Sequence, residues 1–159
     1  MGAVPEARFA PGPGRKGEES RMEIGRMTMD DYESVLRLWT SADGVGLNPA
    51  DDSEEGIGRY LQRNPDTCFV AREQGGVVGA ILSGHDGRRG YLYHLAVDGK
   101  ARRNGVGSAL VQAAVEALRR QGIRKAALVA FEDNAPGNAF WAAQGFTQRS
   151  DLIYRNRTL

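Results

Sequence analysis

Hydrophobic and polar residues follow regular periods from residue 22 to the C-terminal end of the sequence. Apolar side chains at every second position indicate half-buried strands, and apolar side chains three and four positions apart indicate amphipathic helices. These periods predict strands over residues 22–27, 67–72, 77–83, 91–97, 125–131 and 146–157, and helices over residues 29–41, 52–63 and 134–144 and around residues 110–118. The predicted fold class is therefore α/β.

Glycine-containing turns join the predicted strands. Residues 73–76, Glu-Gln-Gly-Gly, connect the second and third strands, and the glycines supply the positive φ angle that a tight hairpin needs. Asp-Gly at 86–87 marks the following turn, so the second, third and fourth strands are predicted to form an antiparallel meander. A helix separates the fourth strand from the fifth, which predicts that these two strands are parallel.

The first 21 residues differ in composition from the rest of the chain. They contain three of the six prolines together with four glycines, and they show neither the strand period nor the helix period. Such a segment buries too little apolar surface to offset the entropy lost on ordering. We therefore predict a disordered tail over residues 1–21 and one folded domain over residues 22–159.

Composition and charge exclude several classes of function. Twenty-one Lys and Arg against twenty Asp and Glu give a net charge of +1, too balanced for a protein that coats nucleic acid or an anionic membrane. The single cysteine, Cys68, excludes a disulfide framework and a multi-cysteine zinc site, and the two histidines, His85 and His94, form no HExxH pair. Without a long apolar run or a signal-peptide pattern, we expect a cytoplasmic protein, metal-free chemistry, and no nucleic-acid or membrane partner.

A glycine-containing loop between a strand and a helix carries the first chemical signal. Residues 102–108 read Arg-Arg-Asn-Gly-Val-Gly-Ser and lead into the helix around residues 110–118. Backbone N–H groups at a helix N-terminus, with glycines that allow close approach, form a cradle for an anion such as phosphate. The loop lacks the Gly-Lys-Ser/Thr of a Walker A motif and the G-x-G-x-x-G of a dinucleotide site. By itself it is equally consistent with a plain turn.

The segments around this loop make the pattern more specific. Leu95-Ala96-Val97-Asp98 precedes it, Arg102, Gly105 and Gly107 fit an Arg-x-x-Gly-x-Gly pattern, and residues 134–146, NAPGNAFWAAQGF, follow one strand later. In these features the sequence resembles the GNAT superfamily of acyl-CoA-dependent N-acyltransferases, especially small stand-alone bacterial members. The resemblance covers residues 22–159. It implies a mixed, mostly antiparallel sheet of six or seven strands with about four helices, splayed between strands 91–97 and 125–131.

The resemblance also implies a site for acetyl-CoA as cosubstrate. Backbone amides of residues 103–108 would bind the pyrophosphate, with the side chains of Arg102 and Arg103 beside it, and strand residues 95–97 would hydrogen-bond the pantetheine arm. Asn134 would contact the arm from the other side, or cap the following helix, or do both. The residues so implied are Leu95, Ala96, Val97, Arg102, Arg103, Asn104, Gly105, Val106, Gly107, Ser108 and Asn134.

The catalytic residues are less clearly marked. The family's Phe-Tyr pair, whose tyrosine often protonates the leaving thiolate, reads Phe140-Trp141 here, and an indole N–H is not a usable acid. By resemblance Tyr91 and Tyr93 occupy positions of catalytic side chains in relatives. Each either binds a water that takes the amine proton or only lines the site. Strict alternation places Tyr91, Tyr93 and Leu95 on one strand face and His94 on the other, so His94 is not predicted to be catalytic.

These observations predict an N-acetyltransferase that moves an acetyl group from acetyl-CoA to a primary amine by direct attack in a ternary complex. The first two helices and their loop, including Trp39, Asp43 and Asp51, are expected to recognise the acceptor. The acidic residues of this loop are alternatively only solvated. The rival hypotheses are a non-catalytic acyl-CoA-binding or protein-interaction module, suggested by Trp141, and nucleotide binding at the glycine loop. A homodimer is compatible with the sequence.

Overall fold

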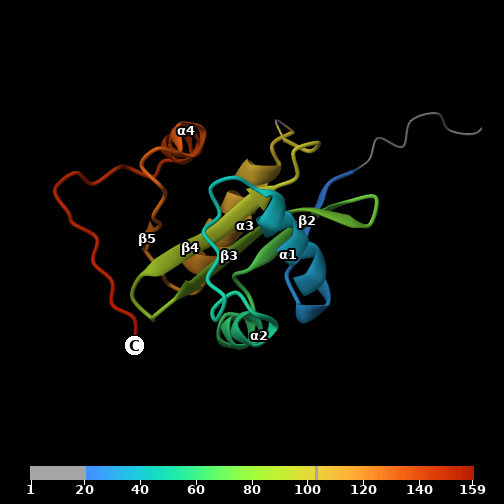
Figure 1. The fold of residues 1–159 in the computed structure, drawn as a ribbon, viewed down its shortest axis with the longest axis horizontal. Coiled ribbons are helices and arrows are strands. Elements are labelled where there is room, and N and C mark those ends of the chain that lie inside the picture. The colour runs from blue at the N-terminus through green and yellow to red at the C-terminus, as the bar shows by residue number, and fades with distance from the viewer. Residues whose placement is uncertain (1–20, 103) are drawn as a thin grey trace, which may run out of the picture.

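The computed structural model describes residues 21–102 and 104–159, so residues 1–20 of the predicted tail and Arg103 lie outside the described part of the chain. The described residues form ten elements (Figure 1). In chain order these are β1 (Glu23–Arg26), the 3-10 turn η1 (Met29–Asp31), α1 (Tyr32–Ser41), α2 (Glu54–Arg63), β2 (Phe69–Glu73), β3 (Gly76–His85), β4 (Gly90–Val97), α3 (Val106–Arg120), β5 (Ala126–Ala127) and α4 (Ala135–Ala143).

The strands form one mixed sheet in the order β1-β2-β3-β4-β5. The first three pairings are antiparallel and the β4–β5 pairing is parallel, as the sequence predicts. Gln74 and Gly75 have φ angles of 50° and 77° between β2 and β3. Two consecutive positive φ angles define the tight turn whose twist matches an antiparallel hairpin, which confirms the predicted hairpin.

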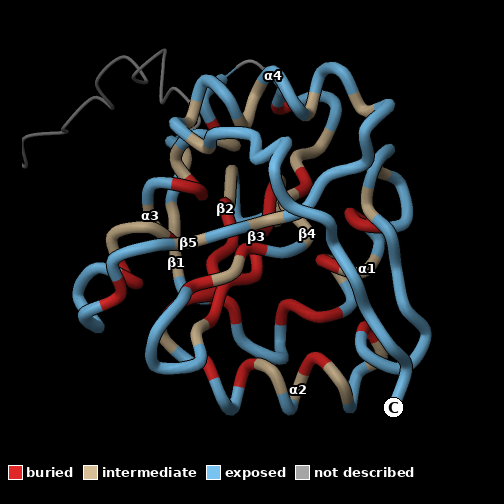
Figure 2. Tube along the Cα trace, turned by 90° about the vertical axis from the view of Figure 1, so that its left-hand side faces the viewer, coloured by how far each residue is buried: buried red, intermediate tan, exposed pale blue. Residues whose placement is uncertain are grey.

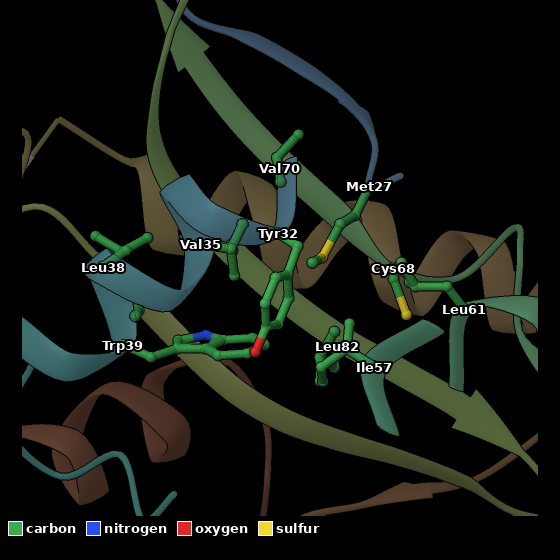
Figure 3. Packing of buried hydrophobic residues seen from close by; sticks show 12 residues of the cluster. Met27, Tyr32, Val35, Leu38, Trp39, Ile57, Leu61, Cys68, Val70 and Leu82 are labelled. Atoms are coloured by element: carbon green, nitrogen blue, oxygen red, sulfur yellow. The ribbon is translucent and has the colours of Figure 1, made fainter. Parts of the chain in front are cut away.

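Helices cover both faces of the sheet. On one face α1 and α2 pack against alternate sheet residues such as Val70 and Leu82, and Figure 3 shows this core around Trp39 and Tyr32. On the opposite face α3 packs through Leu110 against the intervening residues, among them Ile81. Because successive side chains of a strand point to opposite faces, β2 and β3 contribute to both cores and hold the two helical layers together.

The ends of the helices follow local sequence signals. Thr28 donates its backbone N–H to Asp31 Oδ2 at 3.0 Å, as in the predicted capping box before α1. The second helix begins at Glu54 rather than Asp52, because the Ser53 side chain accepts the Gly56 N–H at 3.0 Å and caps the helix there. Gly122, with a φ angle of 82°, follows the end of α3 in the predicted C′ conformation.

Two strand predictions are wrong. The segment 125–131 was predicted to be a buried strand, but only Ala126 and Ala127 pair with β4, and Val129 and Phe131 are each 58% exposed. Residues 146–157 form no strand and are exposed along most of their length (Figure 2). A strand needs a neighbouring edge for its backbone hydrogen bonds, and β5 offers a very short one. Within the described residues the sheet therefore has five strands instead of six or seven.

Candidate active site

A cleft of about 1360 Å³ lies along β4. Its walls come from the α1–α2 loop, α2, β4, the first turn of α3, the segment after β5 and the start of α4. Figure 1 shows the α1–α2 loop, in cyan, passing in front of β4. The cleft thus joins the N-terminus of α3 to the middle of β4, the two regions that the sequence singles out.

The cleft opens where β4 and β5 separate. Their parallel pairing consists of Gly90 with Ala126 and Tyr91 with Ala127. Beyond this point residues 128–131 on one side and Leu95 and Val97 on the other line the cleft. The separation confirms the splay implied by the family resemblance, and it leaves room for an extended molecule between the two segments.

The N-terminus of α3 forms one end of the cleft. Gly105 is the N-cap residue of α3 and has a φ angle of 75°, and the first helical hydrogen bond runs from Ala109 N–H to Gly105 C=O at 3.0 Å. The N–H groups of residues 106–108 precede that bond and lie at the positive end of the helix dipole. Arg102 Nε donates to Val97 C=O at 3.5 Å, which places the guanidinium beside the end of β4.

Glycine is favoured at Gly105 and at Gly107 for different structural reasons. A Cβ atom at Gly105 would meet nothing within 4 Å, so the positive φ angle is what favours glycine there. A Cβ atom at Gly107 would lie 3.3 Å from the Phe140 ring and 3.7 Å from Val97 Cγ2. At Gly107 the reason for glycine is therefore the close approach of the α3 backbone to side chains of α4 and β4.

A β-bulge in β4 changes which side chains face the cleft. Ala80 pairs with Ala96 and Leu82 pairs with Tyr93, so Ile81 of β3 stands opposite two residues, His94 and Leu95. His94 takes a left-handed φ angle of 50°, which is uncommon for a residue other than glycine. The bulge shifts the alternation by one residue within the strand.

The predicted assignment of β4 side chains to the two faces of the sheet is therefore wrong. Leu95 packs with the α3-side core, as Leu92 does, and not with the tyrosines. His94 lies on the same side as Tyr93, and their ring centroids are 6.3 Å apart. Ala96, predicted to share a face with Leu92, is instead buried in the α1-side core. Uniform alternation cannot reveal this, because the bulge depends on the register against β3.

His94 is held by three contacts. Its Nε2 lies 2.8 Å from Asp52 Oδ1, and its backbone C=O accepts the Trp39 indole N–H at 3.0 Å. The Trp39 and His94 rings meet edge to face with centroids 5.1 Å apart. Asp52 is fixed in turn, because its Oδ2 accepts the Asn48 N–H at 2.7 Å. The Asp52–His94 pair is the feature of the cleft that sequence reasoning missed.

A group of tyrosines lines the cleft next to His94. The Tyr91 and Tyr93 centroids are 4.6 Å apart, and Tyr60 of α2 meets Tyr93 edge to face at 6.1 Å. Burial, and after it the neighbouring Tyr154 and Asp51, raise the pKa of Tyr93. Burial and then Tyr93 and Tyr154 raise the pKa of Tyr91. Both hydroxyls consequently keep their protons at neutral pH and can donate hydrogen bonds.

The opposite wall is built by the start of α4. Asn134 Oδ1 accepts the Gly137 N–H at 3.1 Å, which confirms the predicted helix cap. A Cβ atom at Gly44 would lie 2.7 Å from Asn134 Nδ2, so the α1–α2 loop meets α4 at this point. Trp141 also lines the cleft and contacts Phe140 and Phe146 edge to face, with centroids 5.1 and 5.4 Å away.

The structure separates the other predicted site residues into two groups. Asp43 and Asp51 line the cleft, as do Gly105, Val106, Gly107 and Ser108. Trp39, predicted to recognise the acceptor, is 1% exposed and belongs to the α1-side core. Asn104 is exposed in the loop before α3, and Arg103 lies outside the described residues.

Among residues 21–102 and 104–159 no group of three or more His, Cys, Asp or Glu side chains is arranged to hold a metal ion. Within the same residues no helix combines the length and the apolar character needed to span a membrane.

Known proteins similar to this chain share its fold and sequence pattern. Residues 32–146 match the Acetyltransferase (GNAT) family. An acetyltransferase of Photorhabdus laumondii is 41% identical over 113 residues, which cover 71% of this chain and 78% of the relative. The structure of Ard1 from Thermoplasma volcanium aligns with a TM-score of 0.73 at 26% identity, over 81% of this chain and 84% of that one.

A more distant structural relative contains the coenzyme. An aminoglycoside N-acetyltransferase solved in complex with CoA aligns with a TM-score of 0.70 at 19% identity, over 91% of this chain and 100% of that one. This likeness concerns the fold. Together with the family match and the sequence relatives, the splayed sheet and the α3 N-terminus lead to one assignment: the chain belongs to the GNAT acetyltransferase family and is an acetyl-CoA-dependent N-acetyltransferase.

Proposed function

We propose that the protein transfers the acetyl group of acetyl-CoA to a primary amine, by direct attack of the amine in a ternary complex. The observation that carries this proposal is the continuous cleft from the α3 N-terminus to the tyrosines of β4. One end offers backbone N–H groups for a pyrophosphate, and the other offers aromatic rings and carboxylates for an amine. A single cavity that holds both reactants needs no acyl-enzyme intermediate.

The coenzyme would occupy the half of the cleft nearer α3. Backbone N–H groups of residues 104–108 would bind the pyrophosphate, with Arg102 beside it and Arg103 predicted from sequence alone. The pantetheine arm would lie in the splay and hydrogen-bond the backbone of residues 95–97, with Asn134 on the other side. The aminoglycoside N-acetyltransferase of the same fold was solved in complex with CoA, which supports CoA as the ligand.

The acceptor would enter on the side of α2. Asp51 lines the cleft together with the ring of Tyr60, and Asp43 lines it near the point where the α1–α2 loop meets α4. Carboxylates attract an alkylammonium ion, and aromatic faces contribute a cation–π attraction of about 0.5–2 kcal/mol. The uncharged fraction of the amine then attacks the thioester carbonyl. Tyr91 and Tyr93, which keep their protons, would donate hydrogen bonds that orient the acceptor or a water beside it.

Two measurements test the proposal. Calorimetric titration with acetyl-CoA measures coenzyme binding, and a thiol-reactive dye measures CoA release with spermidine, sisomicin or a short peptide with a free N-terminus as acceptor. We expect binding together with thiol release for at least one amine, and initial-rate lines that intersect when both substrates are varied. Binding without thiol release supports the non-catalytic module instead, and parallel lines contradict the ternary complex.

A further inference from the structure

We propose that His94 takes the proton from the attacking amine and that Asp52 is its positioning residue; this inference rests on the proposed N-acetyltransferase function. No prediction from the sequence assigns a role to either side chain.

The first observation is position. His94 lines the cleft at the bulge of β4, next to Tyr93 and one residue before the backbone segment 95–97 proposed to hold the pantetheine arm. The reactive end of an arm that runs from the α3 N-terminus along β4 arrives at this point. His94 is also on the side of α2, where the acceptor is proposed to enter.

The second observation is the orientation of the imidazole. The ring's hydrogen bond within the described residues is between Nε2 and Asp52 Oδ1, at 2.8 Å. A carboxylate only accepts hydrogen bonds, so the proton of the neutral ring is on Nε2 and the lone pair is on Nδ1. Asp52 therefore fixes the tautomer and leaves Nδ1 as the basic atom. The side chains of His94 and Asp52 are 16% and 8% exposed, so bulk water has little access to compete for their hydrogen bond.

The third observation is strain. A φ angle of 50° is unfavourable for histidine, and it persists because Trp39 holds the His94 C=O and Asp52 holds the ring. Without the bulge the same side chain would point into the α3-side core. Three features of the fold, namely the bulge, the buried indole and the buried carboxylate, thus present one imidazole to the cleft.

The amine nitrogen forms a bond to the carbonyl carbon of the acetyl thioester, His94 Nδ1 accepts one N–H proton, and the C–S bond breaks with its electron pair leaving on sulfur. The imidazolium formed is stabilised by Asp52, and its proton is passed to solvent or to the thiolate. The other charged or titratable groups that line the cleft are Asp43, Asp51, Asp52, Arg59, Arg63, Arg102, Tyr60, Tyr91, Tyr93 and Tyr154. The arginines keep their charge, and burial raises the pKa of Tyr60, Tyr91 and Tyr93, so the arginines and these three tyrosines do not accept the proton near neutral pH.

The test compares variants with the fastest amine among spermidine, sisomicin and the peptide. His94→Asn keeps a residue that tolerates a left-handed φ angle, and we expect kcat to fall by at least about 100-fold with unchanged acetyl-CoA affinity. At the acid end, the slope of log kcat/KM against pH should be smaller by one in His94→Asn than in the wild-type protein, because the wild-type base must be unprotonated to act. Asp52→Asn should lower kcat less than His94→Asn. The matched control is His85→Gln, at the half-buried second histidine, which does not line the cleft, and we expect it to keep full activity.

Rescue separates catalysis from structure. His94→Gly removes the ring, and glycine readily adopts the left-handed φ angle at this position. Added imidazole should restore thiol release in this variant while leaving the wild-type rate unchanged. Wild-type activity retained in His94→Asn, or an unchanged acid slope, overturns the assignment of His94 while the acetyltransferase function stands. A wild-type protein that binds acetyl-CoA and releases no thiol with any amine overturns both proposals. Failure of imidazole rescue in a folded His94→Gly protein also overturns the role of His94.

Discussion

Replacing Gly107 by Glu tests the coenzyme site at the α3 N-terminus. The new Cβ atom would lie 3.3 Å from the Phe140 ring, a tight contact that requires the ring to shift by a few tenths of an ångström. The carboxylate would then sit in the first turn of α3. A negative charge there interacts favourably with the helix dipole, by about 0.3–1 kcal/mol, so the fold should not be weakened.

The same carboxylate would oppose a bound pyrophosphate. Two like charges about 5 Å apart repel by about 0.8 kcal/mol in bulk water and by about 3 kcal/mol at an effective dielectric constant of about 20. The cleft mouth lies between these limits. We therefore expect the dissociation constant of acetyl-CoA to rise at least tenfold, which is about 1.4 kcal/mol.

Gly99→Glu is the matched control. It changes the net charge by the same amount in the loop that leads into α3, and a Cβ atom at Gly99 meets nothing within 4 Å. Calorimetry on the two variants should show weak binding for Gly107→Glu alone, with similar melting temperatures. Raising the salt concentration should recover part of the lost affinity, because the Debye length falls from about 10 Å at 0.1 M to about 3 Å at 1 M. Equal affinities for the two variants would refute the placement of the pyrophosphate.

Three other predictions concern the catalytic wall, the cysteine and the core. Tyr93→Phe should lower kcat about tenfold at unchanged acetyl-CoA affinity, whereas Trp141→Tyr should change kcat little; thiol release measured for both variants checks this. Burial raises the pKa of the Cys68 thiol to about 12, so a thiol-reactive dye should label it at pH 8 only after denaturation, and rapid labelling of the folded protein would contradict that. Leu110→Ala should lower the free energy of unfolding by about 2–5 kcal/mol, because Leu110 is fully buried between α3 and the sheet, and denaturant titration measures the loss.

Local signals predicted the parts of the fold that depend on few residues. The hairpin at residues 73–76 follows from turn chemistry, and α3 follows from an apolar face that ends at Gly122. Both require only neighbours in sequence. The parallel pairing of β4 and β5 was also predictable, because a crossover helix fixes the direction of the strand that follows it.

The extent of β5 and the bulge of β4 were not predictable in this way. Residues 128–131 have the composition of a strand, but whether they pair depends on where β4 turns away. The bulge arises from the register of β4 against β3, and one extra residue there reverses the facing of every side chain on one side of it. The predicted contact of Trp39 with the acceptor was wrong for a related reason. Periodicity indicates that a helix has an apolar face, but it does not show which part of the protein packs against that face.

The same bulge connects the stability of the fold to the chemistry of the cleft. A left-handed φ angle at a histidine costs about 1–3 kcal/mol, and the compensating hydrogen bond to its carbonyl comes from Trp39, which is among the most buried residues of the α1-side core. The carboxylate that holds the imidazole belongs to the segment leading into α2, whose Ile57 packs in that same core. The two elements that fix His94 therefore cannot move independently of each other. Since α1 and α2 are anchored by a shared core, the orientation of the imidazole is set by rigid elements of the domain, and the mobile reactants are brought to it.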